Sequence, residues 1–417
     1  MRLPSWLMKL GWSLLDQVSF AAASFLLNAF LARNLTISEY GTFSVVFSIY
    51  ILITAVHTAL ISEPMLVFGA SRYDRKFERY LSTLLRLQWI LSILIAAVLV
   101  VASVIALIFD QTLFASNLLA LSVASPTILG LIFLRRAVYI KNQQYLAGLV
   151  GVIHLILICL LMLLISGPLI DTHIQSWHAF VIMGFSSLFG IFLLSKWLRL
   201  NMHAPTLVTN TQVLKEHWNY GRWSLPANLL SWFPWNFPYI ALAIFSNVES
   251  TGYLRSYMNL VLPFLHVIGA MSTAIVPMLA RRRNTIYYDG FSTRILAFIA
   301  VPSSIYWLLM GLGHGEIVGL LYSGRFIDQS NLLWILAFLP VFEGQIAVLI
   351  SRLRASEQSN LVFFIYLIGA LSSILTSIWF TQLWNLSGLV WGMFLTFTSM
   401  YVSLLWVTSR WVTSRRS

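Results

Sequence analysis

Residues 12–43 read WSLLDQVSFAAASFLLNAFLARNLTISEYGTF. An apolar run over residues 10–31 ends in a short polar stretch that contains Arg33, and a second apolar run starts at Gly41. Each run has about the 20 residues that an α-helix needs to cross a bilayer. This part of the chain is therefore typical of two membrane helices joined by a short loop.

The same alternation continues along all 417 residues, of which 59% are apolar, and only 26 are Lys or Arg and 14 are Asp or Glu. Soluble domains are roughly 45–50% apolar. We predict an all-α polytopic membrane protein with twelve spans, at 10–31, 41–62, 82–109, 117–134, 146–166, 178–198, 223–245, 254–276, 293–312, 329–350, 360–381 and 387–409. The composition excludes a soluble enzyme on a membrane anchor, and the single cysteine, Cys159, excludes an intramolecular disulfide.

The distribution of the basic residues gives the topology. With the N-terminus inside, 23 of the 26 fall on cytoplasmic segments, and only Arg33, Arg255 and Arg325 lie outside. This asymmetry predicts a multi-pass plasma-membrane protein with both termini in the cytoplasm. A net charge of +12 could indicate nucleic-acid binding in a soluble protein, but here the cations are divided among short alternating loops, so nucleic acid is excluded as a partner.

The two halves of the chain share a pattern. Trp12-Ser13-Leu14 recurs as Trp223-Ser224-Leu225 at an offset of 211, which also relates Gly41 to Gly252, and Pro64-Met65-Leu66 recurs as Pro277-Met278-Leu279 at an offset of 213. Since six spans separate the copies, both halves have the same orientation. We predict a six-helix bundle over 1–200, a cytoplasmic linker over 201–222 and a second bundle over 223–417, a parallel repeat known in secondary transporters.

No motif for ATP hydrolysis or zinc peptidase chemistry occurs in the chain, and no predicted loop exceeds about two dozen residues. A polymerase or ligase that joins sugars outside the cell needs a sizeable outer loop for its site. We therefore predict a transporter, not an enzyme, with no cofactor and no metal.

Two stretches resemble a known family. Ala32-Arg33-Asn34-Leu35 followed by Glu39-Tyr40-Gly41-Thr42-Phe43, and the segment 320–326 (LLYSGRF), are similar to Wzx-type polysaccharide flippases of the multidrug/oligosaccharidyl-lipid/polysaccharide (MOP) superfamily. The resemblance implies a V-shaped, MATE-like transporter that works by alternating access in the bacterial inner membrane. It also implies the cargo, an undecaprenyl-pyrophosphate-linked unit of O-antigen (lipopolysaccharide), capsule or exopolysaccharide, and partners among membrane lipids and polysaccharide assembly proteins.

Polar residues recur on corresponding faces of the first and seventh spans. They are Ser13, Gln17, Ser24 and Asn28 in the first, and Ser224, Asn228 and Ser231 in the seventh. Such stripes either line a wet cavity that binds sugar hydroxyls or hydrogen-bond neighbouring helices. The seventh span also holds Pro226, Pro234 and Pro238, which predict a hinge or a static kink, and Trp232 and Trp235, which either stack on sugars or lie at the interface.

Carboxylates inside spans are costly and need a partner, water or a proton. Asp16 and Glu343 are candidates for coupling to H⁺ or Na⁺, whereas Glu63 lies near the interface. The alternative is a structural ion pair with a cytoplasmic-side arginine, and we weigh Arg86, Arg222 and Arg294 as partners. His57, His154 and His266 are candidates for a proton relay, but helix packing is the favoured explanation for each.

A pyrophosphate needs cations, and arginine matches phosphate geometry and stays charged in a low dielectric. Arg222 is our first candidate for capture from the cytoplasm and Arg86 the second, while Arg33 and Arg255 on the outer side receive the headgroup after reorientation. The alternative is snorkelling to lipid phosphates. Outward movement of an anion is favoured by about 2.3 kcal/mol per charge per 100 mV, so membrane potential is a further driving force.

Two other functions remain open. A MATE-type cation-coupled drug exporter predicts an anionic, aromatic cavity, which Asp16, Glu343 and the tryptophans would supply. A membrane polysaccharide polymerase or ligase fits less well, because the outer loops are short.

Overall fold

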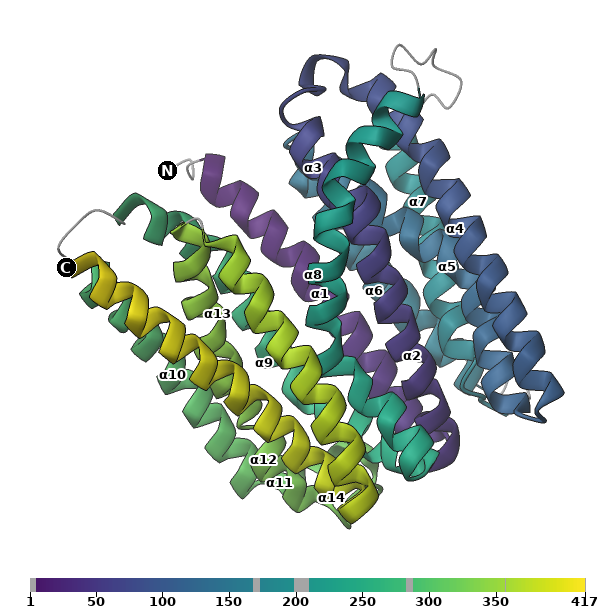
Figure 1. The fold of residues 1–417 in the computed structure, drawn as a ribbon. Coiled ribbons are helices and arrows are strands. Elements are labelled where there is room, and N and C mark those ends of the chain that lie inside the picture. Colours follow the sequence, from purple (N-terminus) through teal and green to yellow (C-terminus); the bar gives the residue numbers. More distant parts are fainter. Residues whose placement is uncertain (1–4, 168–172, 199–209, 283–287, 357, 417) are drawn as a thin grey trace. The chain divides into compact units, whose positions relative to one another are not determined.

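The computed structural model describes residues 5–167, 173–198, 210–282, 288–356 and 358–416. Within these ranges all regular structure is helical (Figure 1). The chain divides into two compact units, Met1–Leu229 and Leu230–Ser417. The predicted all-α class is confirmed.

The N-terminal unit contains seven α-helices of its own and the first part of an eighth. In chain order they are α1 (Ser5–Asn34), α2 (Ile37–His57), the π-helix η1 (Thr58–Ser62), α3 (Glu63–Gly69), the 3₁₀ turn η2 (Asp74–Lys76), α4 (Phe77–Ile108), α5 (Thr112–Ile140), α6 (Gln144–Ser166), α7 (His178–Trp197) and the start of α8 (Asn210–Phe245).

Helix α5 is the centre of this unit. It packs against α2, α4 and α7, while α1 packs against α6. In its most apolar window 72% of α5 is buried, against 22% for α4. The exposed face of α4 carries large apolar residues such as Ile93 and Val98, which suits contact with lipid tails. Helix α5 therefore has protein on most sides, and a polar side chain on it has protein partners within reach.

The C-terminal unit comprises the remainder of α8, then α9 (Val248–Arg282), α10 (Tyr288–Leu312), α11 (His314–Tyr322), the 3₁₀ turn η3 (Ser330–Leu332), α12 (Leu333–Leu336), α13 (Leu339–Ala355) and α14 (Ser359–Arg416). Helix α14 is broken at Trp384 and Asn385, whose backbone angles are not helical. Helix α13 packs against α9, α10 and α14, so it has the same central place as α5.

Each predicted span lies on helical structure. Nine stretches of the described residues are long and apolar enough to cross a membrane, and one of them, Asn360–Ser409, contains two predicted spans on either side of the break in α14. The predicted span 223–245 lies in α8, where Asn228 and Asn236 lower the hydropathy, and the predicted span 254–276 lies in α9.

The internal repeat extends to the helix starts. The Thr36 hydroxyl accepts a hydrogen bond from the Glu39 amide at 3.2 Å, and the Glu39 carboxylate accepts one from the Thr36 amide at 3.1 Å, so together they cap α2. At the offset of 211, the Asn247 side chain accepts from the Ser250 amide at 2.7 Å at the start of α9. Both caps bind the free amides of a first turn, at equivalent places in the two halves.

The predicted linker 201–222 is in part helical, because α8 begins at Asn210. Residues 199–209 lie outside the described part of the chain. The division of the chain into two units falls at Leu229–Leu230, within α8. Continuation of α8 through residues 210–222 is explained by the contacts that this segment makes, which are described below.

Candidate functional site

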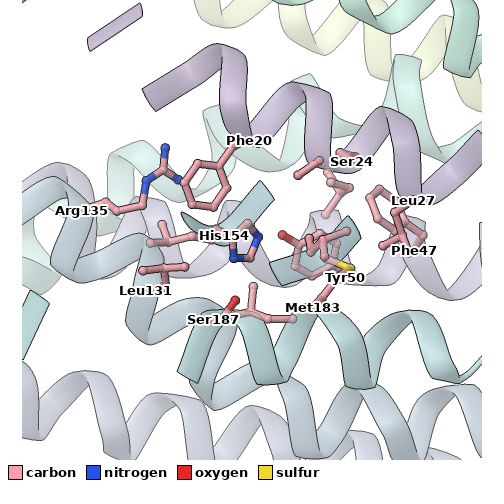
Figure 2. Close-up of a pocket in the computed structure, with 15 residues that line it drawn as sticks. Phe20, Ser24, Leu27, Phe47, Tyr50, Leu131, Arg135, His154, Met183 and Ser187 are labelled. Atoms are coloured by element: carbon pink, nitrogen blue, oxygen red, sulfur yellow. The ribbon is translucent and has the colours of Figure 1, made fainter. Parts of the chain in front are cut away.

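A cavity of about 250 Å³ lies inside the N-terminal unit, between α1, α2, α5, α6 and α7 (Figure 2). Its wall is mainly aliphatic and aromatic. The lining residues are Phe20, Ala23, Ser24, Leu27, Phe47, Tyr50, Ile51, Ile128, Leu131, Ile132, Arg135, His154, Ile158, Met183 and Ser187. An apolar cavity with a few polar groups is the usual form of a small-molecule site.

Arg135, from α5, is paired with Asp16 of α1. Its Nη2 and Nε atoms lie 2.8 Å and 3.0 Å from Asp16 Oδ1, and the Tyr139 hydroxyl donates to Oδ2 at 2.8 Å. The Asp16 side chain is only 2% exposed. Both carboxylate oxygens thus have donors, which offsets the cost of burying the charge.

This pair depends on close packing of α1 against α6. A Cβ placed on Gly151 of α6 would lie 3.3 Å from the backbone of Asp16, and one on Gly148 would lie 3.0 Å from the Trp12 carbonyl. Only a residue without a side chain allows this approach. The guanidinium carbon of Arg135 also lies 3.4 Å from the centre of the Phe20 ring, and Phe20 stacks on His154 at 4.5 Å. Arginine, phenylalanine and histidine therefore form a row along one side of the cavity (Figure 2).

A second polar group connects α2 to α4. His57 Nε2 contacts Gln88 Oε1, and Gln88 Nε2 donates to the Ser92 hydroxyl at 3.0 Å. Since an amide oxygen only accepts, Nε2 of His57 carries the hydrogen. These three side chains are buried. The bonds among them join α2 to α4, as expected if His57 serves helix packing.

Glu63, the first residue of α3, is bonded to α8. The Ser224 hydroxyl donates to Glu63 Oε2, and the Asn228 amide donates to Oε1 at 3.4 Å. Glu63 directly follows the π-helix η1. The sequence placed Glu63 near the interface without a partner, so this bond to the polar stripe of the seventh span was missed.

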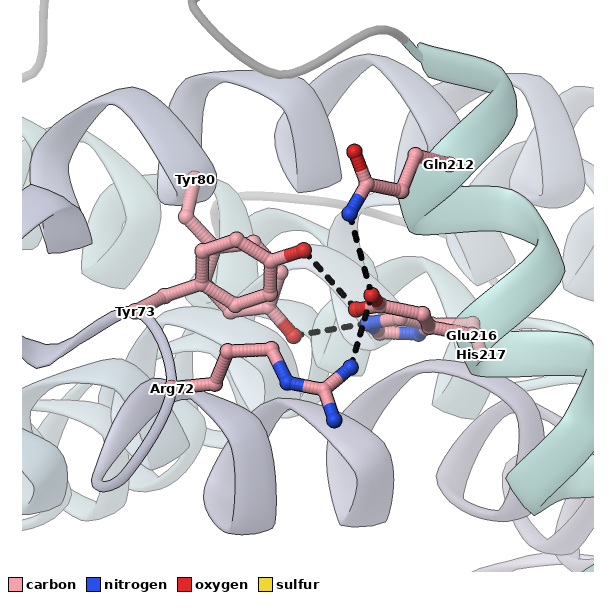
Figure 3. Close-up of polar contacts among 6 residues, drawn as sticks. All are labelled: Arg72, Tyr73, Tyr80, Gln212, Glu216 and His217. Carbon is pink, nitrogen blue, oxygen red and sulfur yellow. Dashed lines mark hydrogen bonds and ion pairs between the residues drawn. The ribbon is translucent and has the colours of Figure 1, made fainter.

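The start of α8 is fastened to the segment before α4 (Figure 3). Glu216 accepts from Arg72 Nη1 at 2.7 Å, from the Tyr73 hydroxyl at 2.8 Å and from Gln212 Nε2 at 3.3 Å. Burial acts to raise the pKa of the Glu216 carboxyl, but these hydrogen bonds and the charge of Arg72 outweigh it and lower the pKa. Burial and the bond to Glu216 raise the pKa of Tyr73 to about 12.

His217 holds α8 to two elements at once. Its Nδ1 donates to the Leu60 carbonyl at 3.0 Å, so in the neutral ring Nε2 is free to accept from the Tyr80 hydroxyl at 2.7 Å. Burial lowers the pKa of His217. Leu60 belongs to the π-helix η1, and Gly221 of α8 packs against the same turn, where a Cβ would lie 3.4 Å from the Ala59 carbonyl. We call the contacts of residues 212–228 with residues 59–80 the α8 clasp.

The N-terminal unit places the other candidates as follows. Asn28 is buried and donates to the Ser24 carbonyl of its own helix at 2.8 Å. Gln17, Arg33, Arg86 and Arg222 are exposed, and the guanidinium of Arg222 lies 5.7 Å from the ring of its neighbour Trp223. The structure therefore does not bring Arg86 or Arg222 to Asp16. The ion-pair alternative for Asp16 is present, but the partner is Arg135.

The candidates in the C-terminal unit are separate from one another. Arg255 is 4% exposed and lies 5.9 Å from the Tyr239 ring, and Trp235 packs on Phe397 at 4.4 Å. Within the described residues no hydrogen bond or ion pair is found for Glu343. The hinge candidates Pro226, Pro234 and Pro238 all lie within the continuous helix α8, so the hinge stays a prediction. The described residues contain no cluster of His, Cys, Asp and Glu that could hold a metal ion.

Sequence reasoning missed Arg135, Tyr139 and Glu216. Arg135 was counted among the cytoplasmic-side cations, and its place at the end of a span put it at a depth similar to that of Asp16. This similar depth could have indicated that Arg135 pairs with Asp16. No comparable signal existed for Glu216, since its partners follow from the docking of α8.

Residues 30–330 match the family described as polysaccharide biosynthesis protein. No curated protein matches the chain. Among solved structures, the chain is similar to an inward-facing MATE-family multidrug transporter of the MOP superfamily, with 12% identity, a TM-score of 0.81, and 96% of this chain and 99% of that chain covered. It is also similar to the lipid II flippase MurJ in an inward closed conformation, with 14% identity, a TM-score of 0.76, and 96% and 87% covered.

A third similar structure is a MOP-superfamily transporter from Pyrococcus furiosus, with 14% identity, a TM-score of 0.67, and 96% and 95% of the two chains covered. At these identities the structural matches show the fold, whereas the family match extends over most of the chain. Both agree with the resemblance drawn from the sequence. The chain therefore belongs to the polysaccharide biosynthesis protein family and has the fold of MOP-superfamily transporters.

Proposed function

We propose that the protein moves an undecaprenyl-pyrophosphate-linked oligosaccharide from the cytoplasmic to the outer leaflet of the bacterial inner membrane. The observation that carries this proposal is the family match over residues 30–330, on a chain with the fold of a lipid II flippase. A glycan is too polar to cross a bilayer unaided. A polysaccharide-synthesis protein whose described residues are mostly apolar helices is suited to move such a glycan across the membrane.

The arginines support an anionic cargo. Arg222 and Arg86 are exposed on segments predicted to face the cytoplasm, and the partner of Asp16 is Arg135 instead. We assign them to capture of the pyrophosphate, and Arg33 and Arg255 to its release at the outer side. Since the cargo carries negative charge outward, membrane potential favours the movement. Coupling to H⁺ or Na⁺ through Glu343 then adds a second driving force.

Helix α8 supports movement by alternating access. Its first part is bonded to the N-terminal unit through the α8 clasp, and residues from Leu230 onward belong to the C-terminal unit. Ser373 of α14, for example, donates to the Phe233 carbonyl at 3.1 Å. Because the two parts of α8 belong to different units, a change between the units bends α8, whose backbone hydrogen bonding Pro226, Pro234 and Pro238 weaken.

Deletion of the gene tests the proposal. Complete undecaprenyl-linked units should accumulate on the cytoplasmic leaflet, and surface polysaccharide should be lost. Complementation with Arg222→Ala should restore less surface polysaccharide than complementation with the wild type. Unchanged surface polysaccharide in the deletion strain would contradict the proposal, and single units accumulating on the outer leaflet would indicate a polymerase.

A MATE-type drug exporter is the second candidate, and Glu343 is the observation that favours it. A carboxylate within a predicted span, without a bonded partner among the described residues, suits a cationic ligand. Under this reading the deletion strain becomes more sensitive to cationic drugs while its surface polysaccharide is unchanged. The same strain therefore separates the two functions.

A further inference from the structure

We propose that the cavity of the N-terminal unit is a subsite for one sugar ring of the cargo. This inference rests on the proposed function and adds to it a place and a set of contacts for the glycan. It starts from hydroxyl groups in the cavity wall that have no protein partner.

Many serines inside the helices of this protein donate to a carbonyl three or four residues earlier. Ser44, Ser48 and Ser186 do so at 2.6 Å, 3.0 Å and 2.8 Å. Ser24 and Ser187, which line the cavity, make no such bond. The Tyr50 hydroxyl, which also lines it, has no hydrogen bond to any described residue. Three hydroxyls from α1, α2 and α7 thus meet one cavity with their hydrogen-bonding capacity unused (Figure 2).

Two further groups add to this set. The Nδ1 atom of His154, a residue that is 6% exposed, is buried and has no hydrogen-bond partner in the described structure. Arg135 uses Nε and Nη2 on Asp16, so Nη1 remains as a donor at the end of the cavity. Because a buried polar group without a partner is costly, these groups together favour an occupant that can hydrogen-bond.

The rest of the wall decides what that occupant is. Phe20, Phe47 and Tyr50 supply aromatic rings, and the remaining positions are mainly aliphatic. A pyranose has hydroxyls at its edge and C–H groups on its faces, so it can satisfy the hydroxyls and pack on the rings together. The volume of about 250 Å³ is large enough for one such ring. Since Asp16 neutralises Arg135, the site suits an uncharged sugar.

The experiment measures binding of five methyl glycosides (of glucose, galactose, mannose, rhamnose and N-acetylglucosamine) to the purified full-length protein in nanodiscs, by saturation-transfer NMR. The test variant combines Tyr50→Phe with Ser187→Ala and removes two hydroxyls with little change of shape. We expect at least one glycoside to bind the wild type, and the double variant to bind it about tenfold more weakly, as two lost hydrogen bonds predict.

Ser186→Ala is the matched control. Ser186 is adjacent to Ser187 in α7, but its hydroxyl is already bonded to the Ile182 carbonyl and does not line the cavity, so binding should be unchanged. A variant that fills the cavity, Ala23→Leu, should abolish binding without removing a polar group. If the double variant proves unstable, Ala23→Leu and Ser186→Ala still test whether the glycoside binds in the cavity.

The proposal is overturned if none of the five glycosides binds, if the double variant and Ser186→Ala behave alike, or if a high-resolution structure with glycoside shows ordered water alone in the cavity. These outcomes leave the flippase function intact provided that deletion of the gene still abolishes surface polysaccharide. If the proposed flippase function is wrong, the deletion strain should instead have normal surface polysaccharide.

Discussion

Asp16 in α1 and Glu343 in α13 are two carboxylates within predicted spans, but their surroundings differ. Asp16 receives hydrogen bonds from Arg135 and Tyr139 on both oxygens. For Glu343 no such donor is found in the described residues. Asp16 therefore acts as half of a fixed ion pair, with its charge compensated by protein. Glu343 has the free coordination that a transported or coupling cation requires, so the coupling proposal is stronger for Glu343 than for Asp16.

Arg135→Gln is the change with the largest expected effect on this comparison. It leaves Asp16 buried without its cation, and breaking a buried pair in this way costs about 3–5 kcal/mol. We expect a large drop in the unfolding temperature of the purified protein, measured in detergent. Arg79 of α4, which is exposed and has no ion pair among the described residues, provides the control, since Arg79→Gln should leave the unfolding temperature nearly unchanged.

The double variant Asp16→Asn with Arg135→Gln sharpens the result. It removes both charges, so most of the lost stability should return. If the double variant is as unstable as Arg135→Gln alone, the loss comes from the packing of Arg135 on Phe20 and not from the unpaired charge of Asp16.

A smaller effect is expected from pH on the α8 clasp. Burial lowers the pKa of His217 from its usual value of 6.5. His217 inside the clasp therefore binds fewer protons than His217 that has been released from the clasp. Stability of the clasp is then complete above the usual pKa and declines as the pH falls below about 6.5. The expected loss is on the order of 1 kcal/mol, the contribution of one hydrogen bond.

Hydrogen–deuterium exchange of residues 211–222 checks this prediction after correction for the intrinsic pH dependence of exchange. Protection should decrease between pH 7 and pH 5.5 in the wild type. His217→Gln should have lower protection at pH 7 and no further change in this range. Glu216 contributes only at lower pH, since its own pKa is below the usual 4.5. Equal protection of the wild type at both pH values would contradict the role of His217.

Glu343→Gln is expected to have the smallest effect on stability, less than about 1 kcal/mol, because it breaks no bond seen in the described structure. Its effect should lie in transport, which should lose dependence on the ion gradient while keeping dependence on membrane potential. A large loss of stability in this variant would show that Glu343 has a structural partner and would remove the contrast with Asp16.

Much of the fold could be predicted from the sequence, because the length of the apolar runs and the placement of arginines are local signals. The offset of 211 between Trp12 and Trp223 also relates the helix caps at Thr36 and Asn247. The site was less predictable. A sequence indicates that Asp16 needs a partner, but the choice of Arg135 over Arg86 or Arg222 depends on how α1 packs, and α1 lies close to α6 at Gly148 and Gly151.

The residues of the α8 clasp show the same limit. The segment 201–222 looked like a linker because it is polar and follows an apolar span. Its polar residues Glu216 and His217 have specific partners on Tyr73, Tyr80 and the Leu60 carbonyl, and these partners stabilise the helix over residues 210–222. The Leu60 carbonyl is within reach because η1 is a π-helix, a local change in winding for which we found no sequence signal.

The central claim, that the protein moves a lipid-linked glycan, is tested most directly in proteoliposomes. Purified protein is reconstituted with an undecaprenyl-pyrophosphate-linked oligosaccharide, and the fraction accessible to an added glycosidase is followed over time. We predict that protein-containing vesicles expose nearly all of the glycan, whereas protein-free vesicles expose only the outer-leaflet half, and that Arg222→Ala slows exposure. Equal exposure in vesicles with and without protein would contradict the account.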